Sequence, residues 1–185
     1  MSSRFRLQWP VDSRTITQRF GENPELYAKF NQAGHEGLDF VAPVGGNVYA
    51  CADGEVFAIQ PDNGNAYGNH VRIRHRVNGQ EYRTVYAHLS ETVASQGQHV
   101  RAGEVIALSG NTGSHTFGAH LHLTLKLVGA KTTGYPDGVV DPFPFLQETE
   151  IPAPSDLTIH ATERVRLRAG PTTNSSQLAW LDKGE

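Results

Sequence analysis

The sequence predicts a mostly β protein with few or no helices. Residues 118–127 alternate between polar and apolar side chains, the period of a β-strand with one buried face. Residues 70–88 form two strand-like runs on either side of Asn78-Gly79, a turn dipeptide that β-hairpins favour. Glycine (19) and proline (10) are plentiful among the 185 residues, whereas helical periodicity is scarce. These observations together favour sheet over helix.

The beginning of the chain combines short apolar runs with a polar stretch. Residues 5–20 are typical of short strands, and residues 22–34 of a polar loop. Gly37 and the nearby Pro43 argue against a helix in the next segment. We therefore expect a turn there that leads into a strand.

Two hairpins are expected next, each around a favoured turn dipeptide. Asp53-Gly54 marks the first turn and Asn78-Gly79 the second. The predicted strands are 47–52 and 55–60 for the first hairpin, and 70–77 and 80–88 for the second. The remaining segments before the alternating strand are a loop over 89–103, a strand over 104–109 and a glycine-rich loop over 110–118. After the alternating strand we expect a closing loop over 129–150.

The alternating strand carries the first candidate site residues. Its leucines, at every second position from Leu121 to Leu127, are expected to form the core face. His120 and His122 lie on the other face, roughly 6–7 Å apart along the strand at about 3.3 Å per residue. Two imidazoles at this spacing can share one metal ion, or one can bind the metal while the other handles protons beside it.

A second group of ligand-type residues precedes the first hairpin. His35 and Asp39 are four residues apart, and although Gly37 keeps them off a helix, a turn that runs into a strand can still bring them together. With His122 they form a His/Asp/His set, the ligand type and number of a catalytic zinc site with one open position. The alternative is that His35 is a surface histidine and Asp39 a turn former.

His88 ends the second hairpin and has two possible interpretations. It is either a strand-end histidine or a catalyst, since the polar side chains of its strand (Tyr82, Thr84 and Tyr86) can line a cleft. The remaining histidines are interpreted as structural or surface residues, with His115 the one that can reach a groove. They are His70, His75, His99, His115 and His160.

Composition excludes several classes of function. The net charge of −3 leaves no basic footprint for nucleic acid. No apolar run approaches the roughly 20 residues that a membrane-spanning helix needs. The first residues lack the apolar core of a signal peptide, so we expect none. Cys51 is the one cysteine, so no internal disulfide is possible, and we expect it to be a small core residue.

Three segments together resemble the LytM/lysostaphin-type zinc metallopeptidases, peptidase family M23. They are His35-x-x-x-Asp39, the segment 86–90 (Tyr-Ala-His-Leu-Ser) and His120-Leu121-His122. The flanking sequence also resembles the family, over Gln18–Gly21, His35–Pro43, Val48–Val56 and Gly103–Gly113. The resemblance covers about residues 7–145. It departs from the family at Ser114–Ala119, where family members usually have Ser-Thr-Gly-Pro, so we expect a different groove wall there.

The resemblance implies a site and a reaction. His35, Asp39 and His122 would bind one Zn²⁺ ion, and His88 and His120 would be the non-ligand histidines beside the metal-activated water and the scissile peptide. The fold would be an antiparallel β-sheet with the site in a groove on the sheet. The reaction would be cleavage of peptide bonds in peptidoglycan stem peptides or cross-bridges, by a monomer in the cell envelope or outside the cell.

A non-cleaving relative is the alternative function. Such LytM-like domains bind the wall or activate an amidase, and they typically lack one or more metal ligands. Because all three ligand positions and both additional histidines are present here, the sequence favours the enzyme.

The resemblance also predicts the domain organisation. Residues 1–150 would form the peptidase domain and residues 151–157, rich in proline, a linker. Residues 158–185 resemble the first part of a bacterial SH3-like domain, carried by Leu-Arg-Ala-Gly-Pro-Thr at 167–172. Since such a fragment is too short to bury an adequate core, we expect a truncated SH3-like β segment. A complete module of this kind would bind cell wall.

Overall fold

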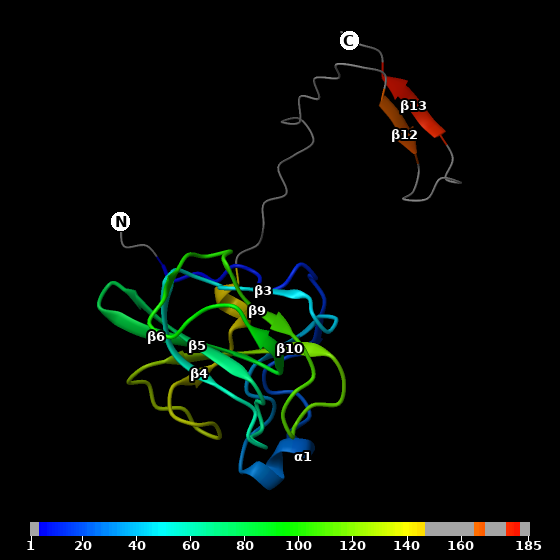
Figure 1. The fold of residues 1–185 in the computed structure, drawn as a ribbon. Helices are drawn as coiled ribbons and strands as arrows, with labels where there is room; N and C mark the ends of the chain where they lie inside the picture. The colour runs from blue at the N-terminus through cyan, green and yellow to red at the C-terminus, as the bar shows by residue number, and fades with distance from the viewer. Residues whose placement is uncertain (1–3, 147–164, 169–176, 182–185) are drawn as a thin grey trace. The chain divides into compact units, whose positions relative to one another are not determined.

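The chain divides into two units. The computed structural model describes residues 4–146, 165–168 and 177–181 (Figure 1). The units are Met1–Gln147 and Glu148–Glu185. The second contains two antiparallel strands, β12 (Val165–Arg168) and β13 (Gln177–Leu181). The predicted linker at 151–157 and most of the predicted SH3-like segment lie outside the described residues, so both stay predictions.

The first unit is built on two antiparallel sheets (Figure 1). The larger sheet has eight strands in the order β1-β2-β10-β6-β5-β4-β8, with β11 beside β10, and the smaller has the order β3-β9-β7. The prediction of a mostly antiparallel β fold is confirmed. The strands are β1 (Ile16–Gln18), β2 (Leu38–Val41), β3 (Asn47–Tyr49), β4 (Gly54–Gln60), β5 (His70–Val77), β6 (Gln80–Ala87), β7 (Leu89–Thr92), β8 (His99–Val100), β9 (Val105–Ser109), β10 (His120–Leu127) and β11 (Val139–Val140).

Short helical turns occur where the sequence predicts loops. The predicted loop at 22–34 instead contains α1 (Pro24–Tyr27) and the 3-10 helix η1 (Ala28–Phe30). Asn23 and Asn31 bound this segment in left-handed conformations (φ 55° and 59°), which asparagine tolerates, and Pro24 suits a first helical turn. A third turn, η2 (Phe143–Phe145), lies near the end of the unit. None of the helices in the described residues is long and apolar enough to cross a membrane.

One of the two predicted hairpins forms. Strands β5 and β6 pair around Asn78 and Gly79, both with positive φ (52° and 78°), as a tight hairpin turn requires. The other prediction is wrong, because β3 pairs with β9 while β4 pairs with β5 and β8. Gly54 allows close packing instead, since a Cβ there would lie 2.6 Å from the Arg74 carbonyl oxygen. The predicted loop at 89–103 likewise contains β7 and β8.

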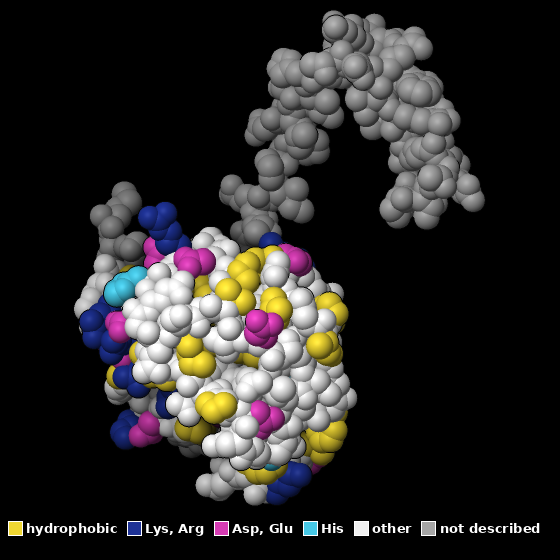
Figure 2. Space-filling view, in the orientation of Figure 1, with side chains coloured by type: hydrophobic (Ala, Val, Ile, Leu, Met, Phe, Trp, Pro, Cys, Tyr) yellow, Lys and Arg dark blue, Asp and Glu magenta, His cyan; other side chains and the backbone are white. Residues whose placement is uncertain are grey.

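The hydrophobic core lies behind β10. Leu121, Leu123 and Leu125 are fully buried, as predicted, whereas Leu127 at the end of the strand is only half-buried; Cys51 is buried as expected. Apolar side chains that remain on the surface form separate small groups on the face shown in Figure 2. The buried leucines of β10 belong to one continuous cluster of core residues.

The polar side of β6 faces this core and not a cleft, which corrects the prediction for Thr84, Tyr86 and Tyr82. Strand register places Tyr86 opposite Leu123 on the core face. Its hydroxyl accepts a hydrogen bond from the backbone N–H of Cys51 at 2.8 Å. Thr84 is also buried, and Tyr82 stacks on a core phenylalanine. The hydroxyls of Thr84 and Tyr86 are tolerated there because both are hydrogen bonded.

Candidate metal centre

Strand register brings two of the predicted ligands together. Strand β10 pairs antiparallel with β2, and His122 lies directly opposite Asp39. Directly opposite residues share a face of the sheet, with Cβ atoms about 5 Å apart. As a result, Nδ1 of His122 lies 2.8 Å from Oδ1 of Asp39. The pairing of β10 with β2 is therefore sufficient to bring His122 and Asp39 together.

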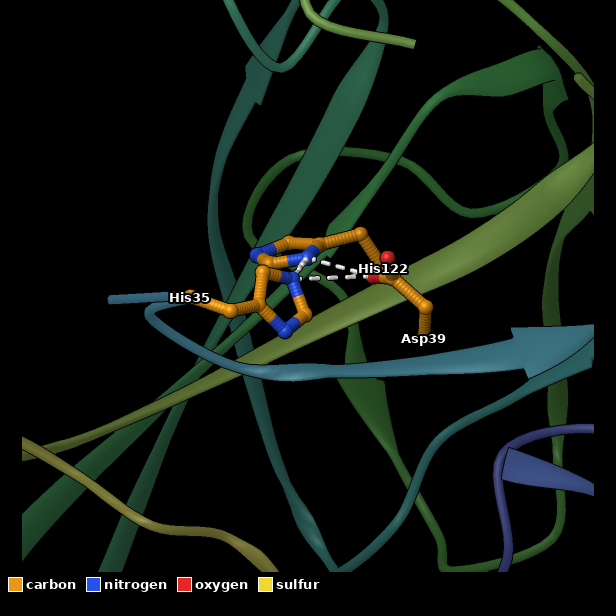
Figure 3. Close-up of side chains that lie close together, drawn as sticks. All are labelled: His35, Asp39 and His122. Atoms are coloured by element: carbon orange, nitrogen blue, oxygen red, sulfur yellow. Dashed lines mark hydrogen bonds and ion pairs between the residues drawn. The ribbon is translucent and has the colours of Figure 1, made fainter. Parts of the chain in front are cut away.

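His35 completes the cluster from the turn that precedes β2 (Figure 3). Its Nε2 lies 2.9 Å from Nδ1 of His122 and 3.2 Å from Oδ1 of Asp39. All three residues are buried, and their ligand atoms lie within 4.8 Å of one another. The structure thus brings together the three residues that the sequence predicts as metal ligands.

Gly37 allows this turn to approach β10. A Cβ at this position would lie 2.4 Å from the carbonyl oxygen of Leu123 and 2.7 Å from Cε1 of His122. Contacts this short require the turn or the strand to move. The glycine between His35 and Asp39 is therefore a packing requirement of the cluster itself.

Gly37→Ala is expected to lower both the stability of the fold and its affinity for zinc. Overpacking at a close contact costs about 1–3 kcal/mol in the free energy of unfolding. Denaturant unfolding in chelator and a zinc titration measure the two effects separately. Gly46→Ala is the control, since its Cβ would meet its nearest atom at 3.1 Å. Zinc affinity in Gly37→Ala equal to that of the unaltered protein would contradict this account of the turn.

The donor set of the cluster fits a cation. The Nδ1–H of His35 donates to the Arg19 carbonyl oxygen at 3.2 Å, which leaves the lone pair of Nε2 directed at the cluster. Three nitrogen and oxygen atoms with lone pairs therefore converge. A single proton can bridge only two of them, whereas a divalent cation can bind all three. Two imidazoles and one carboxylate are the ligand types of catalytic zinc sites.

Asp39 supplies the negative charge of the cluster. Its burial raises the pKa of the carboxyl group, but the adjacent imidazoles of His122 and His35 outweigh burial and hold the pKa well below its usual value. The carboxylate is therefore ionised at neutral pH. An ionised carboxylate between two imidazoles is electrostatically suited to a divalent cation.

His88 and His120 lie beside the cluster without joining it. Their ring centroids are 4.6 Å apart, and Nε2 of His120 is 3.8 Å from Oδ2 of Asp39, the oxygen that does not contact His122. Each ring donates its Nδ1–H to a backbone carbonyl oxygen, Thr112 for His88 at 2.8 Å and Gly118 for His120 at 2.7 Å. Both Nε2 atoms are thereby left as proton acceptors.

The position of His88 depends on a left-handed backbone conformation. Simple strand alternation would place His88 on the core side with Tyr86, but its φ of 62° interrupts the alternation at the end of β6. Non-glycine residues adopt this conformation rarely. Burial, followed by the charge of His122, lowers the pKa of His88 to about 4, so its imidazole is neutral at pH 7. An ordinary histidine at the end of a strand would not be expected to turn toward the cluster in this way.

The cluster opens into a groove of about 730 Å³. Leu26 and Phe30 of the α1–η1 segment line one part of it, and His115 and Phe117 of the loop before β10 line another. The rings of Phe30 and His115 are 4.2 Å apart, so the two parts touch. His115 thus reaches the groove, in the loop where the sequence departs from the resemblance.

The other histidines behave as structural or surface residues where the structure describes them. His75 is buried and hydrogen bonded to Asp53 and Thr84, and His70 is buried beside Gly68. His99 is exposed on β8. His160 lies outside the described residues.

Sequence comparison places these residues in a known family. The sequence pattern of peptidase family M23 matches residues 33–133, more than half of the chain. The chain belongs to peptidase family M23. The matched segment of this M23 chain contains the three cluster residues, together with His88 and His120.

Individual relatives agree with this assignment. A metalloprotease of Haemophilus influenzae without an assigned function is 47% identical over 95 residues, covering 51% of this M23 chain and 19% of its own length. The peptidoglycan DD-endopeptidase ShyA of Vibrio cholerae is 40% identical over 123 residues, covering 66% and 27%. A solved zinc-containing peptidase from Vibrio cholerae superposes with a TM-score of 0.58 at 32% identity, covering 76% and 40%. The match therefore spans less than a third of the length of the two curated relatives.

Two residues of the site have no motif in the sequence. Thr124 contacts Nε2 of His122 at 2.9 Å, and Tyr67 lies with its ring centroid 5.7 Å from that of His122. The signal for Thr124 was its place on the histidine face of the alternating strand. Tyr67 comes from the loop after β4, and its approach to β10 depends on the tertiary fold.

Proposed function

We propose that this chain is a zinc-dependent endopeptidase that cleaves peptide bonds in peptidoglycan. The observation that carries the proposal is the convergence of His35, Asp39 and His122 at a groove that also holds two proton-accepting imidazoles. The names of the relatives support both the substrate class and the metal, since one is a peptidoglycan DD-endopeptidase and another is a zinc-containing peptidase. Stem peptides and cross-bridges are the segments of peptidoglycan that contain peptide bonds.

The five residues divide into two roles in this proposal. His35, Asp39 and His122 hold the ion, which when bound supplies Lewis acidity that polarises the scissile carbonyl and lowers the pKa of water to about 7. His88 or His120 accepts the proton of the water at Nε2 and returns it to the leaving amine. The backbone carbonyls of Thr112 and Gly118 keep both rings in the accepting tautomer.

The substrate sets the place of action that we propose. Peptidoglycan lies in the cell envelope, so the chain would act there or outside the cell, without a nucleic-acid partner and as a monomer. The SH3-like segment expected at 158–185 would contribute wall binding in a longer protein.

Chelation is expected to abolish cleavage. The experiment incubates the purified chain with muropeptides of defined cross-linking, with and without chelator, and identifies products by mass. Cleavage is expected to be lost with chelator and restored by about one equivalent of zinc per chain, because the three ligands form one site. A chain that binds zinc and muropeptides but yields no products would support the non-cleaving alternative. A chain that binds no zinc would overturn the proposal.

A further inference from the structure

We propose that Phe30 and Phe117 form an apolar wall of the groove that selects substrates with an alkyl side chain beside the scissile bond. His115 positions this wall through its contact with the ring of Phe30. The selection rests on the proposed function, because the wall lines the same groove as the metal cluster. It makes alanyl bonds of stem peptides better substrates than glycyl bonds of cross-bridges.

Exposed apolar side chains are concentrated in this groove. The described residues leave eight large apolar side chains exposed, and four of these line the groove: Leu26, Phe30, Val41 and Phe117. Single exposed apolar residues are normal on a protein surface, whereas a group of them in a concave site marks a place where a ligand covers apolar area. The groove therefore has an apolar wall in addition to its polar metal cluster.

Phe30 and His115 join two segments that are far apart in the sequence. Phe30 ends η1, whereas His115 lies in the loop before β10, and the two ring planes are tilted by 42°. Nζ of Lys29 lies 4.9 Å from the centroid of the Phe30 ring. The ring is thus contacted by two side chains, while 40% of Phe30 remains exposed and available to a ligand.

Hydrogen bonds within the loop before β10 hold the other part of the wall. Oδ1 of Asn111 accepts hydrogen bonds from the Thr116 hydroxyl at 2.5 Å and from the Gly118 backbone N–H at 3.1 Å. Phe117 lies between these two residues and is fully exposed. A loop that is already ordered loses less entropy when a substrate binds. Because this loop contains the stretch 114–119, where the sequence departs from the family, the wall is a feature of this chain.

The apolar side chains lie beside a residue that would act on the scissile bond. Val41 is directly opposite His120 in the pairing of β2 with β10, and directly opposite residues share a face of the sheet. Phe117 precedes Gly118, whose carbonyl oxygen accepts the hydrogen bond from His120. A peptide with its scissile bond at the metal cluster therefore places the neighbouring residue against apolar side chains.

Glycine cannot use such a wall because it has no side chain. One missing methylene group in a hydrophobic pocket changes kcat/KM by about 10–200-fold. The lower end of this range is expected here, since Phe30 and Phe117 are open to solvent. Alanyl bonds are thus expected to be cleaved about 10-fold more efficiently than glycyl bonds.

The test compares two peptides that differ only in the residues flanking the scissile bond, D-alanyl in one and glycyl in the other. The unaltered zinc-loaded protein is expected to prefer the alanyl peptide about 10-fold in kcat/KM. The double variant Phe30→Ala/Phe117→Ala is expected to bring this ratio close to one by slowing cleavage of the alanyl peptide, with zinc content unchanged. Both side chains are exposed, so their removal leaves the core intact.

Further variants separate the wall from general effects on the surface. His115→Ala removes the ring contact with Phe30 and is expected to lower the ratio, whereas His115→Phe keeps a ring at this position and is expected to retain it. Phe143→Ala is the matched control, because Phe143 is 42% exposed, close to the 40% of Phe30, and does not line the groove. It is expected to leave the ratio unchanged.

Two outcomes would overturn the wall while cleavage itself remains. One is a ratio near one in the unaltered protein, and the other is an unchanged ratio in the double variant. If the zinc-loaded protein cleaves neither peptide, the proposed function fails, and the dissociation constants of the two peptides then decide the wall. Tighter binding of the alanyl peptide that the double variant loses supports the wall, and equal binding of the two peptides overturns it.

Discussion

His122→Ala is expected to abolish zinc binding and peptidoglycan hydrolysis together. The variant removes Nδ1, which lies 2.8 Å from Asp39 and 2.9 Å from His35, and so leaves only two of three ligands. Loss of the several kcal/mol that a metal contributes to the transition state lowers the rate by about a thousand-fold or more. Zinc content per chain and the rate of muropeptide cleavage, measured on the same samples, test the expectation.

Controls must show that the loss is local, because His122 is buried and hydrogen bonded. Asp39→Asn is a second variant at the same cluster, with nearly the same volume but no charge, and it is also expected to lose zinc. His99→Ala changes an exposed histidine on β8, at the opposite end of the sheet from β1, and should keep both zinc and activity. One equivalent of tightly bound zinc in His122→Ala would show that His122 is not a ligand.

The strand that carries His120 and His122 could be predicted because its signal is local. Polar and apolar side chains alternate along residues 120–127, and burial of Leu121, Leu123 and Leu125 follows from this period. The turn at Asn78-Gly79 could be predicted for the same reason, because a tight hairpin turn requires residues that tolerate positive φ, and both residues adopt it. The three predicted ligands, His35, Asp39 and His122, came from the residue types and from the resemblance to family M23, and the structure brings them together.

Features that depend on distant pairing were not predictable in this way. The dipeptide Asp53-Gly54 resembles a hairpin turn, yet β3 pairs with β9, more than fifty residues later. The prediction that the polar side of β6 lines a cleft was wrong, because strand register places Tyr86 opposite Leu123 on the core face. His88 faces the metal cluster only because φ at this residue is 62°, a conformation that strand alternation does not encode. Tyr67 reaches the ring of His122 from a loop more than fifty residues earlier in the chain.

His120→Ala is expected to lower the rate of cleavage while leaving zinc bound. Its comparison with His122→Ala is closely matched, because the two histidines lie two residues apart on the same face of β10. Nε2 of His120 lies 3.8 Å from Oδ2 of Asp39, whereas His35 and His122 lie close to Oδ1. Removal of a group that transfers a proton lowers the rate by about 10²–10⁴-fold. Loss of zinc in His120→Ala would show instead that both histidines of the pair are ligands.

His88→Asn applies the same test to the second imidazole beside the cluster. Asparagine tolerates the left-handed conformation that His88 adopts, so the end of β6 should keep its shape, whereas an alanine there would add backbone strain. An amide cannot accept the proton, and we expect a rate loss in the same range as for His120→Ala, with one zinc per chain retained. If His88 and His120 serve one proton path, the double variant should be little slower than either single variant. Strictly additive losses in the double variant would show that the two imidazoles act independently.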